Sequence, residues 1–284
     1  MKAIINPRPL AGTVPAIASK SMAHRLIIAA ALANDPTYVV CNTTCADIEA
    51  TVRCLAALGA KIEATEDGFS VRPAPRSVEF GLLKALHGGT LDCGESGSTL
   101  RFMLPVACAL GAEASFIGAG RLGSRPLAPL SDEIIAAGCD LDGLGNFPLK
   151  TSGRMRAGRF VLPGNVSSQY ISGLLLSFPL LDGASKVAVM GKIESRPYIN
   201  LTIQAMKEFG VEVAVRHADA TSAQPETTTF SVNARGYRSP GTVQVEGDWS
   251  NAAFWLCAGA LSNAPIAVEG VSLNSAQGDR NVMA

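Results

Sequence analysis

The sequence predicts an α/β protein built from repeated modules, because two kinds of boundary recur along it at similar intervals. Apolar stretches of helical length end in Gly59, Gly138 and Gly210, and a short alternating strand follows each glycine. These glycines are 79 and 72 residues apart. A repeat of that length holds a whole module of two helices and several strands.

The second kind of boundary is a polar turn that precedes an apolar helix, and it occurs four times. Measured at Ser21, Ser98, Ser168 and Ser250, the turns are 77, 70 and 82 residues apart. Ser, Asn and Asp favour helix starts because their side chains accept hydrogen bonds from the free N–H groups there. Each module is therefore expected to open its first helix at the turn and to close its second helix at the glycine.

The first two modules follow this order. A helix is expected over 22–33, and the stretch 54–63 holds the end of a second helix, Gly59 and a strand. In the second module the turn 94–98 opens a helix, and 134–142 repeats the helix end, glycine and strand.

The third module repeats this order, and a fourth begins. Its polar turn at 167–169 opens a helix, and 206–215 holds a helix end, Gly210 and a strand. A fourth turn precedes an expected helix over 252–261 and strand over 266–271, and the sequence ends where a second helix is due. The periodicity therefore predicts three full modules, part of a fourth, and a chain that is a fragment of a longer protein.

A change in composition near residue 238 predicts a domain boundary. Residues 219–229 are polar, and residues 236–241 are rich in Gly, Ser and Pro. We expect a complete lobe over 20–238 and parts of a second lobe at 1–19 and 239–284.

Composition excludes several classes of protein. The chain has 24 Lys+Arg and 24 Asp+Glu, with 48% hydrophobic residues, so we expect a packed core without the basic surface that nucleic acids or anionic membranes attract. No apolar run approaches the roughly 20 residues of a spanning helix, and the start lacks a signal-peptide pattern. Seven cysteines, an odd number, fit a reducing compartment, so a cytoplasmic location is expected.

Three of the polar turns have the residues of an anion site. Ser19-Lys20-Ser21 precedes Arg25 on the first turn of a helix, Gly94 to Arg101 is a glycine-bearing turn, and Ser167-Ser168-Gln169 offers hydroxyl and amide donors. Each alone is also compatible with an ordinary helix cap and solvated charges. Repeats place equivalent turns side by side, so we expect these helix starts to converge.

Other motifs are weaker. Residues 118–123 match the dinucleotide pattern G-x-G-x-x-G, but Pro126 and Pro129 interrupt the helix that should follow. The cysteines lack the second pair of ligands that zinc needs, so no metal is expected. His24, between Lys20 and Arg25, is expected to face solvent.

Together these motifs resemble the 5-enolpyruvylshikimate-3-phosphate synthase family, whose fold is two inside-out α/β lobes of βαβαββ modules. The resemblance rests on Ser19-Lys20-Ser21-x-x-x-Arg25, Gly94-x-x-Gly97-Ser98-Thr99-x-Arg101, Arg125-Pro126, Ser167-Ser168-Gln169-Tyr170, Ser195-Arg196-Pro197-Tyr198 and Glu246-Gly247-Asp248. The implied reaction transfers the enolpyruvyl group of phosphoenolpyruvate to the 5-hydroxyl of shikimate 3-phosphate, with no cofactor, by a monomer.

The resemblance also implies roles for single residues. Lys20 would be catalytic and, with Gly97, Arg125 and Gln169, would bind phosphoenolpyruvate. The residues implied for shikimate 3-phosphate are Lys20, Ser21, Arg25, Ser167, Ser168, Gln169, Ser195 and Tyr198. The family's acidic catalytic residues would lie beyond residue 284, so the chain is not expected to turn over alone. Glu95 replaces an Asn that is common in the family's glycine turn, and Ala18 replaces a usual Gly.

Three alternatives remain open. The UDP-N-acetylglucosamine enolpyruvyl transferases share the fold, but they carry a reactive Cys where this chain has Gly120. A non-catalytic anion-binding module would need only the helix starts. A dinucleotide-binding oxidoreductase would depend on residues 118–123.

Overall fold

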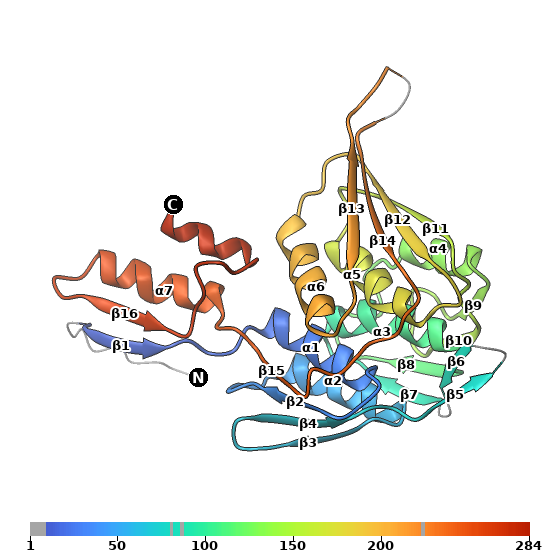
Figure 1. Ribbon diagram of the computed structural model, residues 1–284, viewed down its shortest axis with the longest axis horizontal. Helices are drawn as coiled ribbons and strands as arrows, with labels where there is room; N and C mark the ends of the chain where they lie inside the picture. Colours follow the sequence, from blue (N-terminus) through green and yellow to red (C-terminus); the bar gives the residue numbers. More distant parts are fainter. Residues whose placement is uncertain (1–9, 80–81, 86–87, 223–224) are drawn as a thin grey trace.

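Three four-stranded sheets and the helices packed on them form the larger part of the molecule (Figure 1). The computed structural model describes residues 10–79, 82–85, 88–222 and 225–284. All three sheets have one pattern: two neighbouring strands run parallel, and the third and fourth are each antiparallel to their neighbour. The predicted repetition of an α/β module is confirmed.

The strands of these sheets come in the same spatial order each time. The three orders are β7(Gly89–Asp92)-β8(Ala114–Ile117)-β10(Leu149–Gly153)-β9(Cys139–Asp142), β11(Arg159–Pro163)-β12(Ser185–Met190)-β14(Thr227–Val232)-β13(Val213–Ala218) and β15(Thr242–Gln244)-β2(Thr37–Val40)-β4(Gly68–Arg72)-β3(Lys61–Ala64). The third sheet differs in one respect, because its first strand, β15, comes from the far end of the chain.

The first helix of each module begins at the predicted polar turn. These helices are α1(Lys20–Ala31), α3(Gly97–Leu110) and α5(Ser168–Ser177), and the preceding residues Ser19, Ser96 and Ser167 cap them by accepting from backbone N–H groups. Nearly every residue of α1, α3 and α5 is buried, whichever side of the helix it faces. A helix that is apolar around its circumference belongs inside a core, so these three form the centre of the molecule.

The second helices end at the predicted glycines. They are α2(Ala46–Ala57), α4(Leu130–Ala136) and α6(Arg196–Glu208), and Gly59, Gly138 and Gly210 follow them with φ of 97°, 106° and 73°. Because only glycine adopts such angles without strain, these positions end the helices and turn the chain into β3, β9 and β13.

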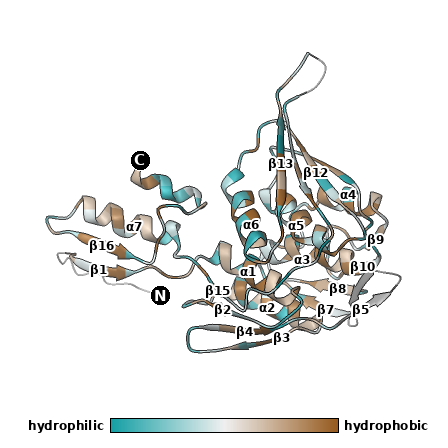
Figure 2. Cartoon of the chain, viewed as in Figure 1, coloured by the Kyte–Doolittle hydropathy of each residue, from teal (hydrophilic) through white to brown (hydrophobic). Residues whose placement is uncertain are grey.

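A smaller unit contains the first and last described parts of the chain. Strand β1(Gly12–Pro15) pairs in parallel with β16(Ile266–Glu269), and α7(Trp249–Ala260) packs against β16. Figure 1 shows this unit to one side of the three sheets, and Figure 2 shows hydrophobic residues on β1 and β16. The predicted strand over 266–271 ends early because Gly270 has φ of 83°.

The chain passes between the two units twice, and the two connecting segments run antiparallel to each other. The Ser19 N–H donates to the Glu246 carbonyl at 2.9 Å, and Ala18 forms a β-bridge with Gly247. Strand β15 lies after the boundary expected at residue 238, yet it pairs with β2 in the larger unit.

The remaining elements are short. They are the hairpin β5(Arg76–Glu79)–β6(Leu82–Ala85) and the 3-10 turns η1(Phe178–Leu180) and η2(Gly278–Met283). None of the described helices has both the length and the apolar character needed to cross a bilayer.

Candidate anion-binding site

A pocket of about 180 Å³ lies where α1, α3 and α5 begin. The residues that line it are Lys20, Ser21, His24, Arg25, Ser98, Phe102, Ser167, Ser168, Gln169, Ser195 and Tyr198. They come from the three inner helices and from the start of α6. The expected convergence of helix starts is confirmed, and the free N–H groups of these helices give the pocket a positive field.

Arg25 is the dominant charge of this pocket. Its side chain is almost fully buried, at 2% exposure, and no carboxylate among the described residues lies within ion-pair distance. The guanidinium donates to Thr202 Oγ1 at 2.7 Å, to the Tyr198 carbonyl at 3.0 Å and to the Ser21 carbonyl at 2.5 Å. Its carbon lies 5.0 Å from the centre of the Phe102 ring.

The burial of Arg25 has an electrostatic consequence. Loss of solvent lowers the pKa of its guanidinium to about 9, which still leaves the group charged at neutral pH. A buried cation without a counter-ion is costly to the fold. Such a group is expected where an anionic ligand completes the site.

Lys20 lies at the pocket mouth and has a carboxylate partner. Its Nζ is 3.0 Å from Asp47 Oδ2 on the first turn of α2. The hydrogen bond to Asp47 raises the pKa of Lys20, although partial burial opposes it. Lys20 is therefore a cation whose charge a ligand would share with Asp47.

The pocket serines supply hydroxyl groups. The hydroxyls of Ser21, Ser168 and Ser195 make no side-chain hydrogen bond with any described residue, so they can contact a ligand. Ser98 is tied to α5, because the Gln169 amide donates to its Oγ at 2.8 Å. Tyr198 closes one side of the pocket and is 45% exposed.

Two further arginines meet at Gly97. A Cβ at this position would lie 2.9 Å from Arg101 Nη1 and 3.0 Å from Arg125 Nη1. Arg101 also donates to Gln169 Oε1 at 2.7 Å and lies over the Tyr170 ring. Gly97 therefore leaves room for two guanidinium groups beside the pocket, and Gln169 connects that of Arg101 to the pocket. Sequence reasoning had assigned no role to Arg101.

Glu95 lies outside the pocket. Its carboxylate packs against Gly120, where an added Cβ would be 2.5 Å from Glu95 Oε1. The negative charge at this position therefore does not line the anion site.

The prediction for His24 was wrong. The residue is 1% exposed rather than solvent-facing, and it lines the pocket on the inner side of α1. Its burial results from α2, because Thr51 of that helix lies against the ring with its Oγ1 at 2.7 Å from Nδ1. Helix periodicity places His24 beside Lys20 and Arg25, and only the packing of α2 shows that His24 is covered.

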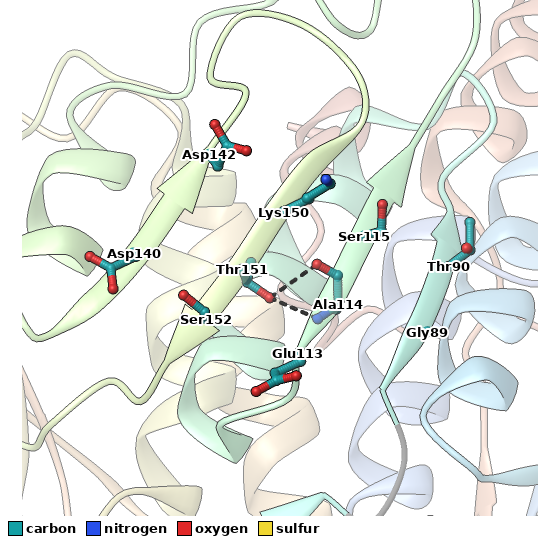
Figure 3. A pocket seen from close by; sticks show the side chains of 10 residues that line it. All are labelled: Gly89, Thr90, Glu113, Ala114, Ser115, Asp140, Asp142, Lys150, Thr151 and Ser152. Atoms are coloured by element: carbon teal, nitrogen blue, oxygen red, sulfur yellow. Dashed lines mark hydrogen bonds between the residues drawn. The ribbon is translucent and has the colours of Figure 1, made fainter.

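A larger cavity of about 530 Å³ lies on the outer face of the sheet that contains β7, β8, β9 and β10 (Figure 3). Its lining includes Asp140, Asp142, Glu113 and Lys150, which are exposed polar residues of a solvated sheet face. None of the residues implied by the sequence lies there. We therefore assign the candidate site to the smaller pocket, which holds a buried cation.

The segment 118–123 and the cysteines belong to the weaker motifs. The segment 118–123 is irregular, and the next helix, α4, begins only at Leu130, so the dinucleotide pattern is not followed by the helix it requires. All seven cysteines are free. Among the described residues there is no cluster of three or more His, Cys, Asp or Glu that could hold a metal ion.

The match to known families agrees with these motifs. The model of the family EPSP synthase (3-phosphoshikimate 1-carboxyvinyltransferase) matches residues 4–284. The chain belongs to the EPSP synthase family. Among curated relatives, the 3-phosphoshikimate 1-carboxyvinyltransferase of Clostridium beijerinckii is 40% identical, and that of Clostridium botulinum strain Alaska E43 is 35% identical. Each match covers 98% of this chain and 62% of the relative, so the chain spans less than two thirds of these proteins.

Solved structures agree on the fold. An EPSP synthase from Acinetobacter baumannii superposes with a TM-score of 0.75 at 23% identity, over 94% of this chain and 57% of that one. A second structure of an EPSP synthase from the same organism gives 0.74. At this identity the likeness supports the mixed α/β fold of repeated modules and carries no information about ligands.

Proposed function

We propose that this chain carries the shikimate 3-phosphate site of a 3-phosphoshikimate 1-carboxyvinyltransferase. The proposed reaction transfers the enolpyruvyl group of phosphoenolpyruvate to the 5-hydroxyl of shikimate 3-phosphate and releases phosphate. The observation that carries the proposal is Arg25, a buried guanidinium without a carboxylate partner in a pocket rich in free serine hydroxyls. Membership of the family supports this choice of substrates.

The pocket residues divide by chemistry. Arg25 and the hydroxyls of Ser21, Ser167, Ser168 and Ser195 suit a phosphate group, which accepts several charge-assisted hydrogen bonds. Gln169 and Tyr198 are suited to the hydroxylated ring of the same ligand. The size of the pocket, about 180 Å³, fits a compact substrate better than a dinucleotide.

Phosphoenolpyruvate would bind beside this pocket. Gly97 lies against Arg101 and Arg125, and Lys20 lies at the pocket mouth. Two adjacent sites rich in cations would hold both anionic substrates in contact and lower the entropic cost of bringing them together. In the proposed mechanism the 5-hydroxyl loses its proton and attacks C2 of phosphoenolpyruvate while C3 takes up a proton. The tetrahedral intermediate then loses phosphate from C2 and a proton from the C3 methyl group, which restores the enolpyruvyl double bond. Lys20 would be a catalytic cation for this step.

The domain arrangement is part of the same proposal. We infer that residues 20 to 244 form a complete inside-out lobe of three βαβαββ modules, because β15 completes the sheet that contains β2, β4 and β3. The unit of β1, α7 and β16 would then belong to a second lobe. As expected of the family, the full-length protein would be a cytoplasmic monomer that needs no cofactor.

Calorimetric titration with a panel of ligands tests the proposed function. The 284-residue chain is expected to bind shikimate 3-phosphate saturably at one site and to show no saturable binding of NAD or UDP-N-acetylglucosamine. Preference for UDP-N-acetylglucosamine would indicate the sister transferase, and preference for NAD would indicate an oxidoreductase. Turnover is a second test, and it requires the chain extended to the length of its relatives.

A non-catalytic anion-binding module is the second candidate. The observation in its favour is that no Asp or Glu lines the described anion pocket. Enolpyruvyl transfer by the extended protein, dependent on phosphoenolpyruvate, would exclude this candidate.

A further inference from the structure

The Nε2 atom of His24 is a buried polar atom without a hydrogen-bond partner. Buried polar side-chain atoms almost always have a partner, so each exception calls for an explanation. This atom belongs to a residue that lines the anion pocket beside Arg25. Its missing partner is therefore expected to come from the ligand.

The rest of the imidazole is held firmly. Nδ1 lies 2.7 Å from Thr51 Oγ1, and Thr51 Oγ1 lies 2.8 Å from Thr99 Oγ1. Thr99 is in turn 2.9 Å from the Oγ of Ser96, which caps α3. The ring also contacts Phe102 edge-on, with 6.3 Å between the ring centres. These contacts fix the ring orientation, and Nε2 is the ring nitrogen that they leave without a hydrogen-bond partner.

The charge state of His24 follows from its surroundings. Burial, together with the positive charge of Arg25, lowers the pKa of its imidazole to about 3. The ring is therefore neutral at neutral pH and carries one proton, on Nδ1 or on Nε2. Because Thr51 and Thr99 can pass hydrogen bonds in either direction, both forms are compatible with the hydroxyl chain.

We propose that His24 is a ligand-binding residue, whose neutral ring donates its Nε2–H to a phosphate oxygen while Nδ1 accepts from the Thr51 hydroxyl. The proposal rests on the proposed function, since shikimate 3-phosphate carries the phosphate group that His24 would contact. An anion in the pocket selects this form of the ring, because the other form would direct a nitrogen lone pair at a negative oxygen. His24 thereby adds a donor without adding a second buried charge beside Arg25.

Two substitutions separate ligand binding from structural support. The amide of Asn lies near the position of Nδ1, and the amide of Gln lies near the position of Nε2. His24→Asn therefore keeps the contact to Thr51 and loses the donor in the pocket, whereas His24→Gln keeps the donor and loses the contact.

The two variants are expected to differ in their affinity for shikimate 3-phosphate. In calorimetric titrations of the 284-residue chain, His24→Asn should bind shikimate 3-phosphate roughly tenfold more weakly, the usual effect of losing one hydrogen bond to a charged group. His24→Gln should stay within about threefold of the wild-type chain by the same reasoning. The reverse order, or equal affinity in all three proteins, would overturn the proposal.

The wild-type chain provides a test that needs no variant. Nitrogen-15 spectra of the imidazole should show Nε2 protonated and Nδ1 unprotonated with phosphate or shikimate 3-phosphate bound, and Nε2 should shift on binding. The His24→Gln spectrum assigns the signal. A proton on Nδ1 in the complex, or no shift on saturation, would overturn the role of His24. Binding of inorganic phosphate with the His24 shift, but none of shikimate 3-phosphate, would overturn the proposed function alone.

Discussion

Arg25 connects the stability of the chain with its proposed function. Its guanidinium is buried, and its hydrogen bonds go to hydroxyls and backbone carbonyls rather than to a carboxylate. Thr202 keeps a hydrogen-bond partner without Arg25, since its Oγ1 also donates to Ser172 Oγ at 2.8 Å. Removal of a buried charge can be neutral or stabilising when the site stays packed.

We predict that Arg25→Met leaves the free energy of unfolding unchanged or raises it. The Met side chain fills the space beside Phe102, and the cost of burying a charge disappears. Urea unfolding of both proteins without ligand measures the difference. A loss above about 3 kcal/mol, the range for breaking an essential buried interaction, would mean that Arg25 is structural.

His24 gives a prediction about acid stability. Its folded pKa is about 3 and the ordinary value is 6.5, so between these values the unfolded chain binds the extra proton more readily. The contribution of this residue to stability is therefore complete above pH 6.5 and falls as the pH drops toward 3, at up to about 1.4 kcal/mol per pH unit.

Urea unfolding at several pH values between 4 and 7 checks this contribution. The wild-type chain should lose more stability on acidification than His24→Gln, which has no titrating group there. If the free energy of unfolding depended on pH in the same way for the two proteins, His24 would not be buried as a neutral ring.

At the scale of elements, the close contact between α3 and α5 positions the pocket. Gly173 of α5 lies against the Arg101 carbonyl of α3, and a Cβ at this position would be 2.2 Å from that oxygen. The same two helices carry Ser98, Arg101 and Gln169, which are joined by hydrogen bonds. A change in the distance between α3 and α5 would therefore move Ser98, Arg101 and Gln169 relative to one another.

We predict that Gly173→Ala destabilises the chain by about 1–3 kcal/mol, the usual cost of overpacking, and weakens anion binding. The reason is that backbone, rather than a flexible side chain, must move. Gly158→Ala is the matched control, because a Cβ there has nothing within 4 Å. Thermal unfolding and phosphate titration of both variants test the prediction, and equal behaviour of the two would contradict it.

The sequence was sufficient to locate the elements that carry the site. Helix starts at Lys20, Gly97 and Ser168 and the glycine ends of α2, α4 and α6 follow from local capping and periodicity. The burial of His24 and the pairing of β15 with β2 depend on contacts between distant segments. Thr51 is 27 residues from His24, and β15 pairs with a strand some 200 residues earlier. No local sequence pattern therefore predicts the contact to His24 or the pairing of β15.

At the scale of the whole molecule, the unit of β1, α7 and β16 exposes apolar side chains. Phe254 is 77% exposed and Leu261 is 91% exposed. A cavity of about 530 Å³ between α7 and η2 is lined by Phe254, Cys257 and Val282. Exposed apolar surface of this kind favours association.

We predict that the chain self-associates at high concentration and that Phe254→Ser with Leu261→Ser reduces this association. Shikimate 3-phosphate affinity should not change, because neither residue lines the anion pocket. Sedimentation over a concentration series measures association, and Ile135→Ser, at an exposed apolar residue of α4, is the matched control. Equal association of the control and the double variant would mean that another surface mediates self-association.

The central claim is that Arg25 holds the phosphate of the substrate, and a calorimetric comparison of shikimate 3-phosphate with shikimate tests it most directly. The wild-type chain should bind the phosphorylated ligand at one site and at least roughly a hundredfold more tightly, as expected for a desolvated charge pair. Arg25→Met should lose this preference while it remains folded. Equal affinity of the wild-type chain for the two ligands, or an undiminished preference in the variant, would contradict the assignment.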